Sequence, residues 1–582
     1  MDFCDILKNN VIHKVMNQKI YTLLFLLFVF ATANAQITVT DASINAGDVV
    51  TWTADNEYLL DGFVFVEEGA TLNIEAGTVI KGKEVPSTGE STSALIISRG
   101  AKIFALGTST NPVIFTAEID DVTDPSDLGP EDNGFWGGLI ILGRASITAD
   151  APCKQIEGIP SGEDRALYGV CDDEGGAANF DDNDDSGVLN YVSIRHGGAA
   201  LAPGNEINGL TLGAVGAQTE IRFVEVMANF DDGIEWFGGT VSVYGAVVSH
   251  CGDDAIDFDQ GWQGGGQYWA IFVDENGDRG GEHDGASGGD DNDPESDPQI
   301  YNATFIGSWG ADRAVLFRDG SSGLYANSIF TRFNTGLEVE DTGDTFDSES
   351  NFLNGDLELF NNIWWDFSAG NGAADFIVPA SSDVITQVVN SNNEIIDPEL
   401  VNIPAGSAGN LTGGLDPRPV PDGNAMTSEL FAVPNDGFYT EPMFKGAFCQ
   451  DGVWLNGWTA VSEYGVIAAN IPSASLDGTD PACFVVNTED LEVEEKGYKL
   501  MQNTPNPAVN ATQIAFELPE TTNVSIVIYD MTGRIIDTPI SSSNLSAGIH
   551  LIDVDLSNYQ GGVYYYTLTN NDVTISKRML VH

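Results

Sequence analysis

Acidic residues recur in the middle of the chain at a spacing that could assemble a cation site. The segments Asp231–Gly239 (DDGIEWFGG) and Asp253–Gly261 (DDAIDFDQG) align at a shift of 22 residues. If each repeat forms one layer of a stack, three pairs of acids come to lie side by side: Asp231 and Asp253, Asp232 and Asp254, and Glu235 and Asp257. Neighbouring carboxylates repel one another, and Ca²⁺ relieves that repulsion because it accepts about six to eight oxygen ligands. The sequence therefore predicts a Ca²⁺ site here, although turn acids can also bond backbone N–H groups and face water.

Two further loops are rich in acidic residues. The segment from position 274 to 285 begins like an EF-hand calcium loop. Its first ligand positions hold oxygen-bearing side chains, at Asp274, Asn276 and Asp278. Arg279 and Gly285 stand where that loop requires glycine and glutamate, so the EF-hand pattern fails. These side chains, and those of Asp181–Gly187 (DDNDDSG), either bind Ca²⁺ or belong to mobile acidic loops.

The same acidic motifs also permit an enzymatic interpretation. Asn229–Glu235 (NFDDGIE) and Cys251–Ile256 (CGDDAI) resemble the acidic motifs of polygalacturonase-type β-helix hydrolases, in which one acid protonates the leaving group and another activates water. The histidine and arginine motifs of that family have only partial counterparts, in Gly281–Gly285 (GEHDG) and in the pair Arg313 and Arg318. The catalytic candidates are Asp232, Asp253, Asp254, His283 and Arg318. A lyase would instead need Ca²⁺ and a basic residue, for which Arg279, Arg313 or Arg318 could serve.

A glycine-rich excursion contains aromatic rings that could stack on sugars. These residues are Trp262, Tyr268 and Trp269; the alternative is that they return to the protein core. His196 and His250 occupy equivalent places near predicted coil corners, where we expect them to bond the backbone of a neighbouring turn. Arg318 is expected to lie over Glu340 one coil later and to form a salt bridge with it.

The formal net charge of −64 restricts the partners of the chain. A surface so negative repels the phosphate backbone of nucleic acids and anionic lipid, so nucleic-acid binding is excluded. It attracts divalent cations, and a polyanionic ligand would need a bridging metal.

Cysteine usage is compatible with an oxidising compartment. Five of the six cysteines follow position 36. Cys153 with Cys171, and Cys449 with Cys483, would each close a moderate loop in a turn-rich stretch. Cys251 lies in a strand pattern and is expected to be a small buried core residue.

The elements that must position these residues are short strands. From Ala70 onward, apolar strands alternate with Gly, Asn and Asp turns, without helical periodicity. The 22-residue shift appears again between Ala314–Asp319 (AVLFRD) and Gly336–Asp341 (GLEVED). We therefore expect an all-β chain, with a right-handed parallel β-helix of about 22 residues per coil over residues 36–415. Residues 416–486 lose the coil rhythm and are expected to cap its C-terminal end, and 487–497 to form a charged linker.

The N-terminus is typical of a secretory signal peptide. A basic stretch precedes the apolar run Tyr21–Phe30, and the small residues of Ala33–Ala35 follow it. We expect cleavage between Ala35 and Gln36, so residues 1–35 form the signal peptide, with Met16 as an alternative start. No other segment is long and apolar enough to cross a membrane.

The C-terminal segment alternates short strands with Pro and Gly turns, which predicts a small Ig-like β-sandwich over residues 498–582. Its motifs, in chain order, are LMQNTPNP at Leu500, QIAFELP at Gln513, VSIVIYDMTGR at Val524, GGVYYYTL at Gly561 and KRM at Lys577. Their order and their place at the chain end resemble the type A C-terminal sorting domain of the type IX secretion system. The resemblance implies export across the outer membrane, with the secretion machinery and a sortase as partners of Tyr498–His582.

The β-helix region resembles a family of secreted β-helix proteins that usually carry this sorting domain. The resemblance lies in GFWGGLIILGRA (Gly134–Ala145), LNYVSIRHGG (Leu189–Gly198), GNEINGLTLGAVG (Gly204–Gly216) and ENGDRGGEHDG (Glu275–Gly285). It implies the architecture and the export route but no activity. We therefore expect a secreted or cell-surface protein, stabilised by Ca²⁺, that acts in adhesion or binds an extracellular glycan or surface ligand. The alternative is a β-helix polysaccharide hydrolase or lyase.

Overall fold

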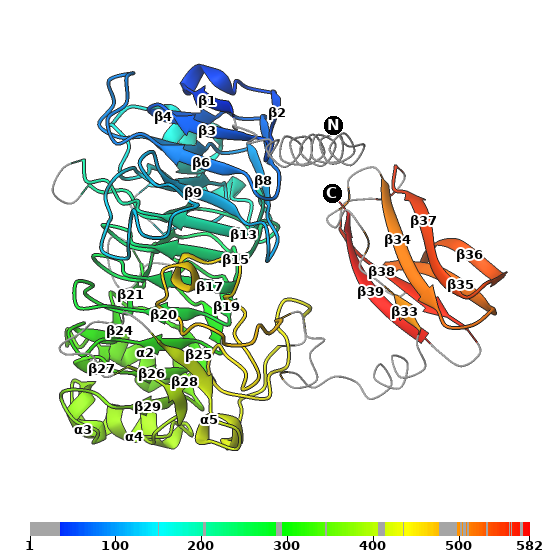
Figure 1. Cartoon of the computed structure of the whole chain (residues 1–582). Helices are drawn as coiled ribbons and strands as arrows, with labels where there is room; N and C mark the ends of the chain where they lie inside the picture. The colour runs from blue at the N-terminus through cyan, green and yellow to red at the C-terminus, as the bar shows by residue number, and fades with distance from the viewer. Residues whose placement is uncertain are drawn as a thin grey trace, which may run out of the picture. The chain divides into compact units, whose positions relative to one another are not determined.

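Most of the strands lie in two parallel sheets (Figure 1). The computed structural model describes residues 35–581 except 149–150, 202–204, 287–293, 344–345, 405–413, 435, 477–482, 484–497, 501–502, 504–507, 509–510, 531–533, 558, 560–561 and 571–573. Two compact units result: the first comprises the described residues up to Tyr439 with Phe444–Ala474, and the second Thr440–Met443 with those from Ser475 onward. The expected signal peptide, 1–35, lies outside the described residues except for Ala35, and the expected linker, 487–497, lies wholly outside them.

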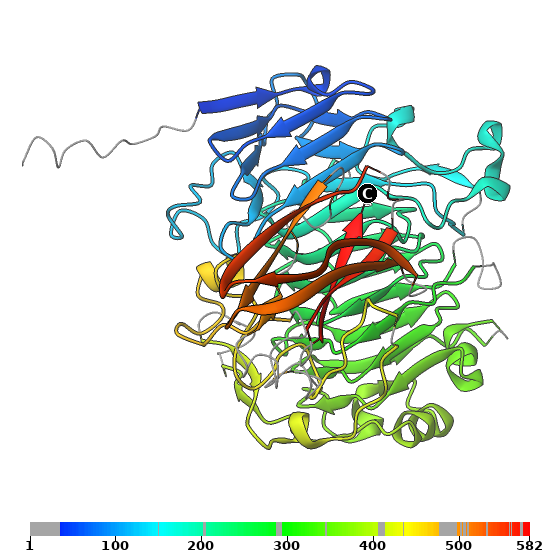
Figure 2. The same ribbon diagram turned by 90° about the vertical axis from the view of Figure 1, so that its right-hand side faces the viewer.

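The first unit is a parallel β-helix, as predicted. Its coils follow one another from the blue to the green end of the ribbon (Figures 1 and 2), and they build parallel sheets of 18 and 10 strands. In the second sheet β16 (Ile234–Phe237) lies beside β18 (Ile256–Asp259), with Ile234 opposite Ile256. This register is the 22-residue shift of the sequence repeat. Later coils carry longer excursions, so β21 (Gly281–Asp284) follows at a wider separation.

The remaining strands of the β-helix divide between the same two sheets. The 18-stranded sheet also contains β1 (Ala35–Val39), β2 (Val49–Trp52), β3 (Asn56–Leu60), β5 (Thr71–Ile74), β6 (Val79–Gly82), β8 (Lys102–Leu106), β9 (Val113–Ala117), β13 (Gly187–Arg195), β15 (Glu220–Met227), β17 (Val243–Ser249), β19 (Gly265–Gln267), β20 (Ala270–Phe272), β22 (Gln299–Tyr301), β23 (Thr304–Ile306), β25 (Gly323–Ala326), β26 (Ile329–Thr331), β28 (Leu357–Phe360) and β29 (Ile363–Trp365). The 10-stranded sheet also contains β4 (Phe63–Val66), β7 (Ala94–Ile97), β10 (Leu139–Leu142), β14 (Leu210–Gly213), β24 (Arg313–Arg318), β27 (Thr335–Val339) and β30 (Ile377–Val378).

Left-handed backbone residues turn the chain at the corners of the coils. His196, Ala228 and His250 directly follow β13, β15 and β17 and have φ of 60°, 55° and 56°. Asparagines at 302, 327 and 361 provide the same conformation between paired strands of later coils, at φ near 55°. Asparagine adopts this conformation more readily than most residues, because its short polar side chain bonds the local backbone. The predicted equivalence of the two corner histidines is confirmed by these angles.

Alternate residues of each strand fill a narrow apolar interior. Ile234 and Trp236 of β16, and Ile256 and Phe258 of β18, are 0% exposed. Aromatic rings continue this core at the C-terminal coils, where Phe330 stacks on Trp364 with ring centroids 4.2 Å apart.

Three short helices lie at the C-terminal end of the β-helix (Figure 1). They are α2 (Ser348–Asn354), α3 (Ala373–Phe376) and α4 (Ser382–Asn390). Phe376 stacks on Trp364 at 6.0 Å, and Val384 and Val388, one helical turn apart, are buried in the same core. These side chains cover the apolar interior where the coils stop.

Residues 416–474 differ in position from the predicted end cap. They contain β32 (Asp416–Pro419, paired with β31, Leu400–Asn402), α5 (Asn424–Thr427) and α6 (Ala460–Glu463). Phe444 O accepts a hydrogen bond from Asn302, and Trp458 contacts Tyr191 edge-on at 5.4 Å, so the segment runs back along the side of the coils. We call residues 444–474 the flanking segment. It covers aromatic side chains on the outside of the long sheet, whereas the helices cover the end.

The second unit is a β-sandwich, as predicted. One sheet contains β33 (Lys499–Leu500), β34 (Ala511–Leu518) and β37 (Gly548–Asp555), and the other β35 (Thr522–Asp530), β36 (Ile535–Leu545), β38 (Gly562–Thr569) and β39 (Thr574–Val581). The pairings within both sheets are antiparallel. Ile514, Phe516, Ile526 and Ile528 are buried between the sheets, in agreement with their alternation in the sequence. Within the described residues of the whole chain, no helix combines the length and hydropathy needed to cross a membrane.

Candidate functional site

A column of carboxylates follows the outward face of the 10-stranded sheet. Glu235 of β16 pairs in register with Asp257 of β18, which pairs with Glu282 of β21. Their neighbours Trp236 and Phe258 face the interior, because side chains alternate along a strand. Asp232 and Asp254 precede these strands at the same corner of successive coils. We call the set Asp231, Asp232, Glu235, Asp253, Asp254 and Asp257 the acid column.

The acid column brings together the acids that the repeat predicts to be neighbours. One carboxylate oxygen from each of Asp232, Glu235 and Asp257 lies within 4.8 Å of the others. The same holds for Asp231, Asp232 and Asp253. Asp253 is exposed and Asp232 is buried, so the column extends from solvent into the protein.

Burial raises the pKa values of these acids. It lifts the pKa of Asp232, Glu235 and Asp257 well above the ordinary range, and nearby carboxylates add to the shift. At Asp231, burial together with Glu157, Glu206 and Asp253 raises the pKa to about 7. Two buried oxygens, Oδ1 of Asp254 and Oδ1 of Asp257, have no hydrogen-bond partner. Such a group binds a proton or a cation, because an unpaired buried charge is unstable.

Two residues that the sequence reasoning missed adjoin the column. Asn208 donates from Nδ2 to Glu157 Oε1 at 2.9 Å and also to Glu235, while its Oδ1 is buried without a partner. Glu157 comes from an excursion between β10 and β13, so no repeat relates its position to that of Glu235. In the sequence, only the acidic side chain at position 157 could have indicated that this residue belongs near the acid column.

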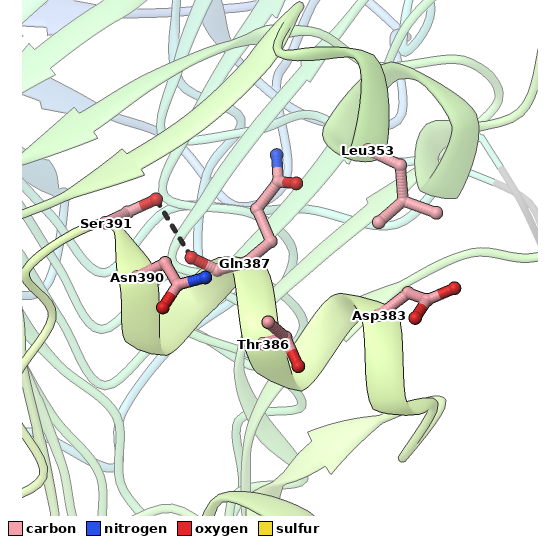
Figure 3. A pocket seen from close by; sticks show the side chains of 6 residues that line it. All are labelled: Leu353, Asp383, Thr386, Gln387, Asn390 and Ser391. Carbon is pink, nitrogen blue, oxygen red and sulfur yellow. Dashed lines mark hydrogen bonds between the residues drawn. The ribbon is translucent and has the colours of Figure 1, made fainter.

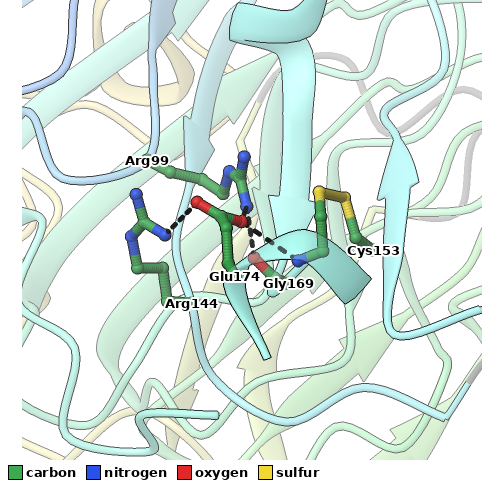
Figure 4. The surroundings of a disulfide bond; sticks show 6 residues. Arg99, Arg144, Cys153, Gly169 and Glu174 are labelled. Atoms are coloured by element: carbon green, nitrogen blue, oxygen red, sulfur yellow. Dashed lines mark hydrogen bonds and ion pairs between the residues drawn. A yellow bond between two sulfur atoms is a disulfide. The ribbon is translucent and has the colours of Figure 1, made fainter. Parts of the chain in front are cut away.

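The excursion that contributes Glu157 is held by a disulfide (Figure 4). Cys153 and Cys171 are bonded, as predicted, at the base of a hairpin of β11 (Cys153–Gln155) and β12 (Leu167–Gly169). Glu174 lies beside it, with Arg99 at 2.7 Å and Arg144 at 3.0 Å. Burial alone would raise the pKa of Glu174, but these two arginines and the Cys171 N–H outweigh it and lower the pKa to about 2. The excursion packs Tyr168 and Ile156 onto the outward face of the 10-stranded sheet.

The other cysteines also behave as the sequence predicts. Cys449 and Cys483 are each disulfide-bonded. Cys251 is a free thiol, 3% exposed, within the core of the β-helix.

Two arginines beside the column are held in ion pairs. Arg279 lies 3.0 Å from Asp254 and 3.0 Å from Glu282. Arg318 bonds Asp284 at 2.5 Å, on the preceding coil, and not Glu340 as expected; Glu340 instead accepts the backbone N–H of Asp319. The hydrogen bond to Asp284 raises the pKa of Arg318. Neither guanidinium is therefore suited to remove a proton.

His283 is a core residue and not a catalytic group. Its ring stacks on Phe258 with centroids 4.1 Å apart, and its Nε2 bonds the hydroxyl of Tyr325 at 2.8 Å. The side chain is 0% exposed, and burial lowers its pKa to about 3. The partial resemblance of GEHDG to a histidine motif could not show the direction of this side chain; its strand pairs His283 with Phe258, which faces the interior.

The three aromatic residues for which sugar stacking and return to the core were the alternatives are all buried. Trp262, Tyr268 and Trp269 are 0% exposed. Trp236 stacks on Trp262 at 4.6 Å and on Trp269 at 5.6 Å, and both indole N–H groups donate to backbone carbonyls. Trp262 and Trp269 belong to the core of the β-helix, whereas Tyr268 is buried against Tyr244 and against Phe444 of the flanking segment, so none of the three has a surface to offer a ligand.

The predicted calcium loop is divided between two places. Asp278 lies with Asp253 and Asp254, each offering an oxygen within 4.8 Å of the others. Asn276 donates to Asp274 at 3.0 Å, away from that group. The third acidic loop is occupied by protein partners: Asp182 accepts from the backbone of Ser146, and Asp185 pairs with Lys102.

Two hollows lie away from the column. One, of about 450 Å³, lies between α2 and α4 and is lined by Leu353, Asp383, Thr386, Gln387, Asn390 and Ser391 (Figure 3). It contains a single ionisable group and none of the predicted site residues. The other, of about 710 Å³, is lined by four carboxylates, of Glu295, Asp297, Asp356 and Glu358. Burial, together with Glu358 and Asp356, raises the pKa of Asp297 to about 6. Excursions separate these acids in sequence, so the 22-residue shift did not indicate them.

Comparison with known proteins agrees with both units. Residues 504–582 match the secretion system C-terminal sorting domain, which indicates export to the cell surface or the medium by the type IX secretion machinery. No curated protein matches the chain. Among solved structures, the chain is similar to the crystal structure of the enzymatically active domain of tailspike protein 2 of bacteriophage CBA120, at 9% identity, 93% coverage of this chain, 73% coverage of that chain and a TM-score of 0.22. Residues 43–396 match the pectate-lyase like beta helix domain. Since that match spans more than half of the 582 residues, the chain belongs to the family of pectate-lyase-like β-helix domains.

Proposed function

We propose that this exported protein is an extracellular polysaccharide-binding β-helix that holds Ca²⁺ in the acid column and acts in adhesion. The observation that supports this most directly is the pair of buried, unpartnered oxygens, Asp254 Oδ1 and Asp257 Oδ1, among carboxylates that face one another. Ca²⁺ binds several carboxylate oxygens in loose geometry and is available outside the cell.

Binding of a cation would remove the main electrostatic cost of the site. Arg279 contacts Asp254 and Glu282, whereas no lysine or arginine in the described part of the chain forms an ion pair with Asp232, Glu235 or Asp257. Leaving buried charges uncompensated costs about several kcal/mol for each ion. A divalent ion would offset that cost without disturbing the register of the coils.

The charge of the protein limits how an acidic glycan could bind. A chain of net charge −64 repels an anionic polysaccharide unless a metal lies between them. Asp231 and Asp253 lie at the outer end of the column, where an ion could share its remaining positions with sugar carboxylates or hydroxyls. We therefore expect Ca²⁺-dependent binding of a uronate-containing glycan, the class to which pectate belongs.

A calcium titration tests the metal. Ca²⁺ should raise the melting temperature over that in chelator, since a ligand at about 100 times its Kd stabilises a protein by about 2.7 kcal/mol. Asp257→Asn should melt higher than wild type in chelator and should lose most of the response to Ca²⁺. Asp55→Asn, in an exposed turn of the first coil, is the matched control and should respond as wild type does. An unchanged wild-type melting temperature would contradict the calcium site.

Glycan arrays probed with Ca²⁺ and with chelator test the ligand. We expect binding to uronate-containing glycans only with Ca²⁺. Binding that is equal in chelator, or restricted to neutral glycans, would reject this ligand class while leaving the calcium result standing.

A second candidate function is hydrolysis of a polysaccharide in the hollow of about 710 Å³. Asp297, whose pKa is raised to about 6, could protonate a leaving group while Glu358 acts as the carboxylate, as paired acids do in glycosidases. A lyase has less support, because Arg279 and Arg318 are held in ion pairs. Reducing-sugar release that is lost in Asp297→Asn would favour the hydrolase; binding without release would favour adhesion.

A further inference from the structure

Three side chains converge outside the acid column, at a corner of the β-helix. His250 directly follows β17, and Asp274 follows β20 on the next coil. Glu131 comes from the excursion between β9 and β10. One oxygen of Glu131, one oxygen of Asp274 and one imidazole nitrogen of His250 all lie within 4.8 Å of one another. We propose that these three residues bind one divalent transition-metal ion of the zinc class.

The imidazole of His250 is arranged as a metal ligand would be. Its Nδ1 lies 2.6 Å from the hydroxyl of Ser249, whereas its Nε2 is buried and has no hydrogen-bond partner. When the Ser249 oxygen accepts the Nδ1–H, the lone pair of the ring is left on Nε2. Metal-bound histidines use their second nitrogen in this way, because that hydrogen bond fixes both the tautomer and the ring orientation.

Burial favours the neutral form of this ring. His250 is 3% exposed, and burial lowers its pKa, although Asp274 acts in the opposite direction. A neutral imidazole is the form that coordinates a metal, and a buried nitrogen without a partner is otherwise unfavourable.

The two carboxylates are held together by an amide. Asn276 donates from Nδ2 to Glu131 Oε2 at 2.8 Å and to Asp274 Oδ2 at 3.0 Å. No lysine or arginine of the described residues forms an ion pair with Glu131 or Asp274. Burial, Asp274 and Glu275 raise the pKa of Glu131, as expected for a carboxylate that lacks a compensating charge.

The donor set distinguishes this site from the acid column. Ca²⁺ takes oxygen ligands, whereas one imidazole nitrogen with two carboxylates suits Zn²⁺ and related ions. Three protein ligands leave a fourth position for water. Glu131 is exposed, so an ion can reach the site from solvent.

The equivalent histidine provides an internal contrast. His196 has the same place at the corner after β13, but both of its ring nitrogens are engaged, by Asp132 O and by the hydroxyl of Tyr464 at 2.8 Å. A histidine at this corner is therefore not a ligand by position alone. The open nitrogen and the convergent carboxylates distinguish His250.

Zinc titration of the full chain, without a polyhistidine tag and with Ca²⁺ in large excess to fill the acid column, tests the site. We expect one Zn²⁺ per chain. Glu131→Gln should weaken its binding at least tenfold, of the order of ligand-shell changes in zinc proteins. His250→Ala should abolish it, and His196→Ala should retain wild-type affinity. Glu131 is exposed, so its variant keeps the test valid even if the His250 variant fails to fold.

Cobalt provides a second measurement, because the visible spectrum of bound Co²⁺ reports its ligands. Wild type and His196→Ala should give the same spectrum, and Glu131→Gln a weaker or shifted one. Absence of Zn²⁺ binding by wild type, or wild-type affinity in both ligand variants, would overturn the proposal.

Discussion

At the scale of single residues, the sequence repeat predicted which acids of the acid column are neighbours, and the raised pKa values of these acids predict a pH dependence that can be measured. The 22-residue shift correctly placed Asp231 with Asp253 and Glu235 with Asp257, because hydrogen-bonded parallel strands keep their register. It could not show that Asn208 and Glu157 complete the surroundings, since Glu157 lies in an excursion and Asn208 lies on the preceding coil at a shift of 24 residues.

Stability without metal should increase as the pH is lowered from about 8 to about 5. Asp231 and Asp284 have pKa values raised from 3.8 to about 7, mainly by burial. An acid whose pKa is raised on folding stabilises the folded state below its unfolded pKa, and this contribution is lost as the pH rises through about 7. Melting temperatures across this range in chelator measure the effect.

Saturating Ca²⁺ should flatten this pH dependence, because the bound ion keeps the column ionised at lower pH. A melting temperature that falls steadily from pH 8 to pH 5 in chelator would show that the column does not control stability in this range.

Substitution of Trp262 tests whether the aromatic residues pack in the core or stack on sugar at the surface. Trp262→Ala should destabilise the β-helix by about 3 to 5 kcal/mol, because it removes a large side chain stacked on Trp236 and leaves a cavity. Urea denaturation measures the change. Phe230→Ala, which alters a side chain 49% exposed, should cost less than about 1 kcal/mol.

The folded fraction of Trp262→Ala should bind glycan as wild type does. A selective loss of binding with unchanged stability would restore the sugar-stacking interpretation. The sequence could not decide whether Trp262 faces the core or a ligand, because the glycine-rich excursion interrupts the strand alternation that would show which residues face inward.

At the scale of elements, the flanking segment depends on a buried carboxylate of the coil beneath it. Glu225 of β15 accepts the backbone N–H groups of Ala460 and Val461 at 2.7 and 3.0 Å, where α6 begins. Arg195 is buried alongside and pairs with Glu463 at 2.8 Å. The sequence predicted a cap because Pro and Trp replaced the coil rhythm. It could not reveal the position of the segment, which depends on contacts more than 200 residues apart.

Glu225→Ala should release the flanking segment. The change removes the carboxylate that accepts both backbone N–H groups and leaves Arg195 without its buried neighbour. Leaving a buried charge without its partner typically destabilises the folded state by about 3 to 5 kcal/mol. Limited proteolysis should then cut within 444–474 at protease concentrations that leave wild type intact.

Glu220→Ala on the same strand is the control for this experiment, because that side chain is only half-buried and should not alter cleavage. Equal resistance of Glu225→Ala and wild type would show that other contacts retain the segment.

At the scale of the whole molecule, the two units have separate cores and separate tasks. The apolar cluster of the sandwich contains residues only from Tyr498 onward. The order of its motifs was sufficient to predict the export route. Short strands that are separated by turns and repeat at a regular shift were sufficient to predict the β-helix. The export route and the β-helix could both be predicted because each depends on local sequence patterns. The candidate site includes side chains from excursions of irregular length, which explains why the sequence indicated the acids but could not decide whether the tryptophans face a ligand or the core.

Removal of residues 498–582 should abolish export and leave the β-helix folded. The truncated chain, ending at Gly497 and so retaining Cys483, should accumulate inside the cell envelope. Cell fractionation followed by a thermal melt of the purified fragment measures both effects. Normal surface delivery of the truncated chain would contradict the assignment of the sorting domain, and an unfolded fragment would show that the units are interdependent.

The flanking segment also has a consequence for how the molecule unfolds. Repeat proteins commonly lose their coils one after another, since each coil contacts only its neighbours. Here Gly446 bonds Asn327, Trp454 packs near Phe223 and Trp458 packs on Tyr191, so one strip of chain contacts coils that are far apart in the stack. Loss of any of these coils also costs contacts to the strip. The flanking segment therefore couples coils that would otherwise unfold independently, so that the middle of the β-helix unfolds cooperatively. During folding, this part is complete only after residues 444–474, which are synthesised last, have packed back along the coils.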